Sequence, residues 1–295
     1  MPKRGPQQSQ IQILRASVFG QIPWLVHGFS TRLGGVSRSY GKAALNLGLT
    51  RDDSRSAVER NRAAFLVELS SEAKTQNLNS WPLVTLRQVH SDIIRRIHTP
   101  GEAPLPGDGL ITNAPGVLLA VQTADCLPVI LVDVKKRAVA LLHAGWRGTT
   151  KRIVEKGVGE MRRCFGTCPR DLKAAIGPGI QGCCYEVGEE VCEHFESQFA
   201  YAGKLFRVVE ESDPVREKYP MLFLTARAPG HSDLPKKTYL DLVEANRQQL
   251  LAAGVPAKNI EASELCTGCR TDLLFSYRGE KGKTGRMMAV AGIRP

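Results

Sequence analysis

His90, Cys126 and His143 are the side chains of this sequence whose types could together carry out metal chemistry. Two imidazole nitrogens and one thiolate sulfur suit a soft divalent ion such as zinc, and they would leave a fourth position open for water or substrate, as catalytic zinc sites do. Their spacing along the chain matches no standard metal motif. Because a cysteine or histidine at a strand end is more often a packing residue, that alternative stays open on the spacing alone.

The elements around Cys126 and His143 indicate how these two side chains could meet. Residues 127–134 and 138–143 are apolar runs on either side of a polar turn, a pattern that predicts an antiparallel hairpin. If residues 133–136 form the loop, Cys126 lies directly opposite His143 on the same face. We therefore expect the thiol and the imidazole to be neighbours at the open end of the hairpin.

Other helix and strand signals alternate along the chain. Apolar residues at helical spacing, with a cap or a terminal glycine, predict helices at 54–69, 149–165 and 241–253. Short apolar or β-branched runs predict strands at 117–122, 172–176 and 288–293 in addition to the hairpin. This alternation predicts an α/β or α+β fold.

The length of the chain permits one large domain or two small ones, and the sequence favours one. Its 295 residues are 42% hydrophobic, and no long linker rich in proline, glycine or polar residues divides them. We expect a flexible N-terminal tail at residues 1–20 and a single catalytic domain at residues 21–295.

Composition also indicates where the protein acts and what it binds. The best apolar window, residues 116–134, is interrupted by polar side chains, and glutamines follow the first basic residues, so neither a membrane span nor an export signal is expected. Eight irregularly spaced cysteines fit reduced thiols in the cytoplasm. The net charge of +11 is spread along the chain, so attraction of phosphate-bearing or anionic small molecules, or simple solubility, explains it as well as nucleic-acid binding does, and we expect no nucleic-acid partner.

Some of the remaining cysteines come in pairs that could bind a metal. These pairs are Cys164 with Cys168, Cys183 with Cys184, and Cys266 with Cys269. The last pair is a CxxC, and the first pair would be its partner in a structural zinc site, although CxxxC is a less usual partner. The adjacent pair is poorly placed to chelate one ion and is interpreted as packing. We therefore expect about one zinc ion per chain, at the trio.

A glycine-rich segment at residues 177–182 matches the pattern GxGxxG. A dinucleotide site would require a helix to begin at this motif and an acidic residue to follow at the end of a second strand. The sequence after the motif is irregular instead. We interpret the segment as a backbone loop near the substrate.

Several blocks of the sequence resemble one protein family. They are HGFSTR at 27–32, QVH at 88–90, TADCLP at 123–128, HAGWRG at 143–148, IGP at 176–178, CYEV at 184–187, FSYR at 275–278 and TGR at 284–286. In this order they resemble the YfiH-type, or laccase-domain, purine nucleoside phosphorylase family, which also carries the labels multicopper polyphenol oxidoreductase and peptidoglycan editing factor. The similarity extends from about residue 25 to the end of the sequence.

The resemblance implies a single domain with α/β/β/α layers and mixed sheets. It also implies a zinc ion held by the histidine of QVH, the cysteine of TADC and the histidine of HAGWRG, which here are His90, Cys126 and His143, with copper possible in the same site. The implied activity is phosphorolysis of adenosine, inosine and methylthioadenosine, together with adenosine deamination. GDGL at 107–110 and the second cysteine of CTGC at 266–269 depart from the usual family pattern.

Other residues in these blocks are candidates for handling phosphate and protons. Phosphorolysis requires cationic donors, for which Arg147 is the stronger candidate and Arg32 the weaker, although either could form a structural ion pair instead. Asp125 or Asp108 could carry a proton, unless Asp125 only caps its turn.

Two other classes of function would use the same residues. Cys126 could be the nucleophile of a cysteine hydrolase or of a peptidoglycan-precursor editing enzyme, with His143 as its base, and His90 would then be surplus. A copper-loaded polyphenol oxidase could use all three side chains. A multicopper laccase would need more imidazoles than the six histidines of this chain. Metal content and a nucleoside activity panel distinguish these classes.

Overall fold

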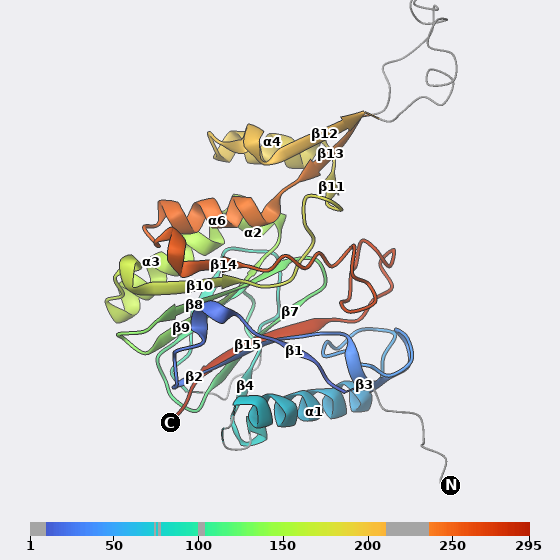
Figure 1. Ribbon diagram of the computed structural model, residues 1–295, viewed down its shortest axis with the longest axis vertical. Helices are drawn as coiled ribbons and strands as arrows, with labels where there is room; N and C mark the ends of the chain where they lie inside the picture. The colour runs from blue at the N-terminus through green and yellow to red at the C-terminus, as the bar shows by residue number, and fades with distance from the viewer. Residues whose placement is uncertain (1–9, 74, 76–77, 100–103, 211–235) are drawn as a thin grey trace, which may run out of the picture.

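Two β-sheets packed face to face, with helices on both outer faces, form the body of the fold (Figure 1). The computed structural model describes residues 10–73, 75, 78–99, 104–210 and 236–295. The arrangement confirms the predicted α/β/β/α layers with mixed sheets. Residues 1–9 of the predicted tail lie outside the described residues.

The first sheet has a strand from the end of the sequence at its centre. Its order is β1 (Ile13–Leu14), β2 (Leu25–Ser30), β15 (Met287–Ile293), β7 (Leu118–Thr123) and β4 (Leu83–Val84). All neighbours are antiparallel except β4 and β7, which are parallel. The short β3 (Leu33–Ser37) follows β2 outside this order.

The second sheet contains the predicted hairpin. Its order is β14 (Ile260–Ala262), β10 (Leu172–Ile176), β8 (Leu127–Asp133), β9 (Ala138–Ala144), β6 (Gly109–Thr112) and β5 (Ile94–Arg96). The edge pairs β10–β14 and β5–β6 are parallel, and the rest are antiparallel. A small antiparallel sheet is separate from both and has the order β11 (Glu186–Val187), β13 (Lys236–Leu240) and β12 (Phe206–Glu210).

The helices cover the outer faces of the two large sheets (Figure 1). α1 (Arg55–Ala73) covers the first sheet, whereas α3 (Ile153–Phe165) and α6 (Leu242–Ala252) cover the second. The short α2 (Trp146–Thr150) follows β9, and α4 (Glu189–Gln198) lies beside the small sheet. The 3-10 turns are Ser17–Phe19, Leu78–Ser80, Pro169–Asp171, Ala202–Lys204 and Ala257–Asn259. Within the described part, no helix combines the length and apolar character that crossing a membrane requires.

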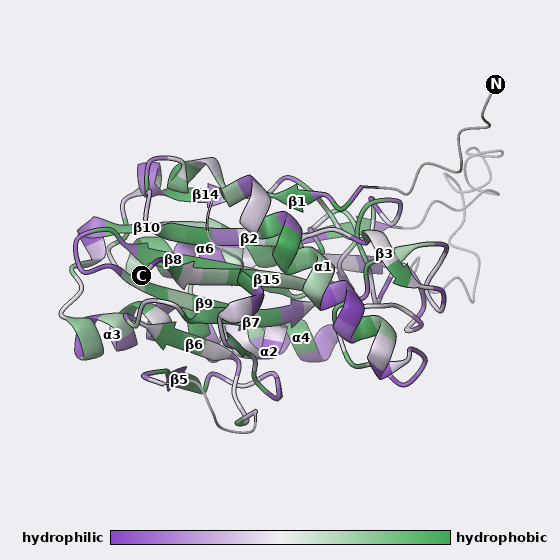
Figure 2. Ribbon diagram, turned by 90° about the horizontal axis from the view of Figure 1, so that it is seen from below, coloured by the Kyte–Doolittle hydropathy of each residue, from purple (hydrophilic) through white to green (hydrophobic). Residues whose placement is uncertain are grey.

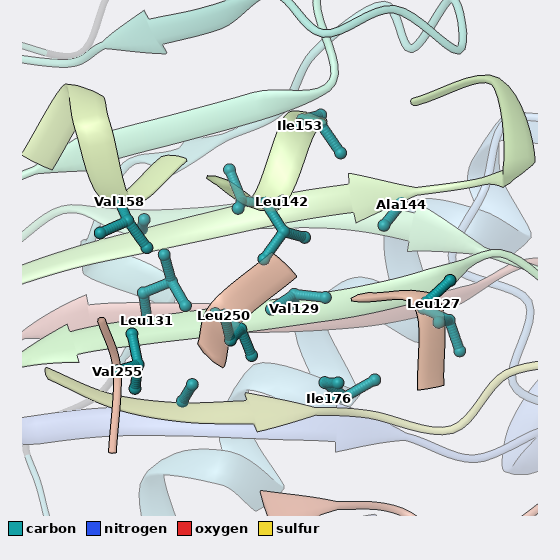
Figure 3. Packing of buried hydrophobic residues seen from close by; sticks show 14 of the residues in the cluster. Leu127, Val129, Leu131, Leu142, Ala144, Ile153, Val158, Ile176, Leu250 and Val255 are labelled. Carbon is teal, nitrogen blue, oxygen red and sulfur yellow. The ribbon is translucent and has the colours of Figure 1, made fainter. Parts of the chain in front are cut away.

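The central strands are apolar on both faces because both faces are covered. Along β8, Val129 and Leu131 pack toward α3 and α6, and Ile130 and Val132 pack between the two sheets. Figure 3 shows the first of these clusters, and the hydrophobic colour of the central strands is visible in Figure 2. All seven residues of β8 are buried, which explains its continuous apolar run.

The predicted elements are present, with one break that the sequence pattern did not indicate. The helix predicted at 149–165 is two helices, because Arg152 between α2 and α3 adopts a left-handed conformation with φ of 63°. The predicted caps are confirmed at the other two helices. The backbone N–H of Glu244 donates to Asp241 Oδ1 at 2.8 Å, and the N–H of Ala57 donates to Ser54 Oγ at 3.1 Å.

The register of the hairpin differs from the prediction. Asp133 pairs with Ala138 and Pro128 pairs with His143, so the loop begins one residue later than expected. The Asp133 side chain accepts hydrogen bonds from the backbone N–H groups of Lys135 and Lys136, both at 2.9 Å, and this local turn explains the shift. Cys126 precedes Pro128 by two residues, so it shares the face of His143 as a diagonal neighbour rather than a direct one.

Residues 13–19 belong to the fold, and the predicted tail boundary at residue 20 conflicts with this. Ile13 and Leu14 pair with Ser30 and Phe29 of β2. Phe19 is only 2% exposed, within the cluster between the two sheets. The β1–β2 pairing and the buried ring of Phe19 therefore fix residues 13–19 against the core.

His27 on β2 should make the protein less stable in mild acid. Burial lowers the pKa of His27 to about 4, and the positive charge of Arg15 acts in the same direction. In the unfolded chain His27 is protonated below about pH 6.5, whereas in the folded protein it stays neutral down to about pH 4. The free energy of unfolding therefore falls as the pH drops from about 6.5 to about 4. The full difference in the pKa of His27 is worth about 3 kcal/mol of unfolding free energy.

Urea unfolding at pH 7 and pH 4.5 should show a smaller loss for His27→Gln than for the wild type. The exposed His98→Gln is the control and should behave as the wild type does.

Candidate active site

One end of the second sheet brings together the three predicted metal-binding side chains. His143 lies near the end of β9, and Cys126 lies in the turn between β7 and β8. His90 comes from the loop between β4 and β5. Two of the three therefore stand on or beside central strands, which gives them rigid support.

The geometry of the three side chains is close enough for one ion. Their candidate ligand atoms all lie within 4.8 Å of one another. The Nε2 atom of His90 is 3.8 Å from the Sγ atom of Cys126, and the imidazole rings of His90 and His143 are 5.1 Å apart at their centroids. Gly145 allows this approach, because a Cβ atom there would lie 2.8 Å from the sulfur of Cys126.

Asp108 supports two of the three side chains. It immediately precedes β6 and is fully buried, and its own carbonyl accepts a hydrogen bond from the backbone N–H of His143 at 2.7 Å. Its carboxylate accepts from the Nδ1 atom of His143 at 2.9 Å and from the backbone N–H groups of Val89, His90 and Ser91 at 3.2, 3.0 and 2.6 Å. The hydroxyl of Ser91 also donates to it, at 2.7 Å. The contact with Nδ1 leaves Nε2 of His143 as the atom available to a metal.

Backbone conformations at the site are strained in two places. His90 has φ of 56° and Asp125 has φ of 92°, in the left-handed region that non-glycine residues rarely adopt. The three hydrogen bonds from residues 89–91 to Asp108 hold the His90 turn in place. At Asp125 the turn reverses the chain between β7 and β8 and exposes the Cys126 thiol to the cavity.

The ionisable groups of the trio shift one another. Burial raises the pKa of Cys126, but the charge on His143 and hydrogen bonds from both histidines outweigh burial and bring the pKa down to about 6. Burial lowers the pKa of His143, but the Cys126 thiolate and Asp108 outweigh it and raise the pKa to about 9. For Asp108, hydrogen bonds from His143 and Ser91 overcome burial and hold the pKa well below its usual range. The site therefore favours a thiolate, and a bound cation would take the place of the proton on His143.

A cavity of about 490 Å³ opens onto the trio. Its other polar and aromatic lining residues are Gln88, Gln122, Asp125, Tyr185, Tyr277, Arg278 and Arg286. The side chain of Gln88 accepts a hydrogen bond from the backbone N–H of Gln122 at 2.7 Å and donates one to the backbone carbonyl of Gln122 at 2.8 Å. These two bonds tie the His90 loop to β7. The volume is in the range of small-molecule sites.

Arg278 and Arg286 supply positive charge to the cavity. No carboxylate among the described residues is within ion-pair distance of either guanidinium. Arg286 donates to the backbone carbonyls of Thr284 and Gly285 at 3.2 and 3.0 Å, and Arg278 donates to that of Glu186 at 2.9 Å. These contacts fix the two side chains and leave their charge available to an anion.

The two arginines predicted for phosphate lie elsewhere. Arg32 forms an ion pair with Glu280 at 3.0 Å, donates to the carbonyls of Thr271 and Tyr40, and stacks on Phe275. These contacts favour the structural alternative for Arg32. Arg147 is exposed, lies over the ring of Trp146, and lines a different hollow beside α2 and α4.

Asp125 lines the cavity, but its carboxylate is occupied. It accepts hydrogen bonds from the hydroxyls of Thr267 and Ser276 at 2.6 and 2.7 Å and from the backbone N–H of Arg278 at 2.7 Å. These bonds tie the β7–β8 turn to the segment around residues 267–278. They favour a role in holding this segment over a role in carrying protons.

Sequence reasoning missed the two cavity arginines and misjudged the paired cysteines. Arg278 and Arg286 stood in two of the family-like blocks, FSYR and TGR, and a charged residue in such a block was the available signal. The CxxC of Cys266 and Cys269 lies beside Cys183 and Cys184, not beside Cys164 and Cys168, and these four cysteines could hold a second metal ion.

The fold and the site together define a layered mixed α/β protein in which a His–Cys–His group at the end of a sheet shares a cavity with two arginines. The family model described as multi-copper polyphenol oxidoreductase laccase matches residues 26–294. The chain belongs to this family, which includes the YfiH and YlmD proteins.

Individual relatives agree with this assignment. The chain is 36% identical to the purine nucleoside phosphorylase YlmD of Geobacillus stearothermophilus, over 91% of this chain and 90% of that protein. It is 39% identical to adenosine deaminase RL5 of an unknown prokaryotic organism, over 63% and 62%. The crystal structure of the Bacillus licheniformis hypothetical protein YfiH superposes with a TM-score of 0.77 at 32% identity, covering 96% of both chains.

Proposed function

We propose that this protein is a zinc-dependent purine nucleoside phosphorylase that acts on adenosine, inosine and methylthioadenosine and also deaminates adenosine. The observation that carries the proposal is the shared cavity, which places a soft-metal donor set and two arginines without a carboxylate partner among the described residues around one small-molecule volume. The names of the relatives support it. The same proposal assigns the activity to one domain, which includes the residues from β1 to β15.

The donor set of the trio fits zinc. One sulfur and two imidazole nitrogens are borderline-soft ligands, and three protein ligands leave one coordination position open, as in catalytic zinc sites. His90, Cys126 and His143 would hold the ion, and Asp108 would orient His143 and the His90 loop. When bound, the ion would supply a Lewis-acid charge that polarises a substrate atom.

The remaining residues of the cavity have distinct tasks in phosphorolysis. Phosphate carries the negative charge, and we place it on Arg278 and Arg286 because Arg32 is committed to other contacts and Arg147 lines another hollow. The aromatic faces of Tyr185 and Tyr277 offer surfaces for the purine. The Gln88 and Gln122 pair fixes the wall between these groups and the trio.

A nucleoside panel with and without phosphate tests the proposal. Adenosine, inosine and methylthioadenosine should yield free base and pentose 1-phosphate only when phosphate is present. Adenosine should also release ammonia without phosphate. If zinc-loaded protein with phosphate turns over none of these nucleosides, the proposed function is wrong.

Arg286→Ala should raise the KM for phosphate by roughly tenfold to a hundredfold, because one charge-assisted hydrogen bond is worth about 1.5–3 kcal/mol. Initial rates at varied phosphate concentration measure this change. Arg147→Ala is the matched control, since it removes the same charge from the neighbouring hollow. An equal rise in KM for both variants would mean that phosphate binds outside the proposed position.

A cysteine hydrolase is the second candidate function, and one observation favours it. The pKa of Cys126 near 6 is what a nucleophilic thiol requires, and His143 is close enough to act as its base. Chelation separates the two functions. A hydrolase would keep or gain activity when metal is removed, whereas the proposed phosphorylase would lose it. Copper reconstitution of the same site tests the polyphenol oxidase alternative.

A further inference from the structure

Four cysteine sulfurs come together next to the wall of the cavity, apart from the trio. They belong to Cys183, Cys184, Cys266 and Cys269, and all four lie within 4.8 Å of one another. The sulfur of Cys269 is 3.5 Å from that of Cys183 and 3.3 Å from that of Cys184. Four sulfurs placed 2.3 Å from a tetrahedral zinc ion are about 3.8 Å apart. The group therefore already has nearly the dimensions of a zinc tetrathiolate.

The four thiols are not joined to one another. All four are free cysteines, and the two shortest sulfur–sulfur distances far exceed the bond length of about 2.05 Å in a disulfide. Thiols are weak hydrogen-bond partners, so four of them gain little by meeting in a half-buried place. A soft cation at their centre would give the arrangement a physical reason.

The backbone around Cys266 forms a tight turn that lies against Cys184. The backbone N–H of Arg270 closes the turn on the Cys266 carbonyl at 3.0 Å. Gly268 is required here because a Cβ atom would lie 2.8 Å from the Cβ of Cys184. The glycine therefore lets the CxxC turn lie directly against Cys184, which brings the cysteines of the two loops together.

We propose that Cys183, Cys184, Cys266 and Cys269 bind a structural zinc ion, separate from the ion at the trio. Four thiolates complete a tetrahedral shell and leave no position for substrate, which is the hallmark of a structural zinc site. On this proposal the chain would bind two zinc ions, where the sequence led us to expect one. The adjacent cysteines, which the sequence suggested were packing residues, supply half of the ligands.

The ion would fasten two loops that already touch. The backbone N–H of Thr267 donates to the carbonyl of Gly179 at 3.1 Å, and Gly179 and Cys266 form an isolated bridge. Tyr185, which lines the cavity, directly follows one ligand, and the guanidinium of Arg278 lies 5.8 Å from the centre of its ring. The zinc would therefore hold the wall of the cavity without contacting the substrate.

Metal analysis of four proteins tests the proposal. Purified under reducing conditions with zinc, the wild type should contain two zinc ions per chain, Cys126→Ala one and Cys269→Ser one. Cys168→Ser removes a thiol outside the group and should keep two. The melting temperature should fall for Cys269→Ser and stay unchanged for Cys168→Ser. A wild type with one zinc that Cys269→Ser does not change would overturn the proposal.

Cobalt substitution tests the site without altering any of its four ligands. Cys126→Ala loaded with cobalt should show the intense visible and sulfur-to-metal charge-transfer bands of a tetrahedral tetrathiolate. Absence of these bands contradicts the proposal, and so does a Cys183–Cys269 or Cys184–Cys269 disulfide found by peptide mapping of protein prepared under reducing conditions. None of these readouts depends on nucleoside turnover, so they remain decisive if the proposed activity is wrong.

Discussion

His143→Ala should abolish phosphorolysis while the protein stays folded. The substitution would remove one of the three proposed ligands, and with it most of the affinity for the zinc ion that we propose polarises the substrate. We expect kcat/KM to fall by roughly a thousandfold or more, equivalent to about 4 kcal/mol of transition-state stabilisation. The loss of stability should be smaller, about 1–3 kcal/mol, because Asp108 keeps its other hydrogen-bond donors.

Two measurements separate this result from simple unfolding. Steady-state kinetics and zinc content should both collapse, whereas urea unfolding should still show a cooperative transition. His194→Ala is the control, since that histidine lies over Trp146 in the neighbouring hollow and should retain activity and zinc. Full turnover by His143→Ala would rule out the trio as the reaction centre.

Asp108→Asn should damage the site almost as severely, although Asp108 lies outside the trio. Every contact of its carboxylate comes from a donor: three backbone N–H groups, the Ser91 hydroxyl and the His143 imidazole. An amide NH₂ must therefore face either the backbone donors or Nδ1 of His143. In the second case the imidazole changes tautomer, and the proton moves to the nitrogen that a metal needs. A buried donor without an acceptor adds to the cost.

We expect Asp108→Asn to weaken zinc binding by roughly ten- to a hundredfold and to lower the free energy of unfolding by about 3 kcal/mol. Competition with a chromophoric chelator measures the first quantity, and urea unfolding measures the second. Ser91→Ala removes only one donor to the same carboxylate and should give a clearly smaller change in both. Wild-type zinc affinity in Asp108→Asn would show that Asp108 does not position the ligands.

Much of the fold could be predicted because the local signals agree with the tertiary structure. The strand predicted at 172–176 matches β10, and the cap at Asp241 starts α6 as expected. The break at Arg152 could not be predicted, because a left-handed residue inside an amphipathic pattern is stabilised by its surroundings. The register of the hairpin shifted because the Asp133 side chain accepts hydrogen bonds from backbone N–H groups two and three residues later, and these bonds set where the turn begins.

The candidate site was predicted unevenly for similar reasons. Cys126 and His143 are near in sequence, so a hairpin argument brought them together. Arg278 and Arg286 lie more than a hundred residues from the trio in the sequence, and Cys183 and Cys184 lie on a different loop from the CxxC. The placement of all four depends on long-range packing, which no local pattern encodes. The role of Asp108 was equally hidden, because it depends on the pairing of β6 with β9.

The central position of β15 imposes an order of events during synthesis. β2 and β7 are both made early, yet neither pairs with the other, since β15 lies between them and bonds to each along its length. Until residue 293 has left the ribosome, both strands have an open edge whose backbone groups can recruit a strand from another nascent chain. The second sheet, whose last strand ends at residue 262, can form earlier. A chain that stalls between these points would thus display the strands that position the His–Cys–His trio beside a first sheet that is still incomplete and prone to aggregation.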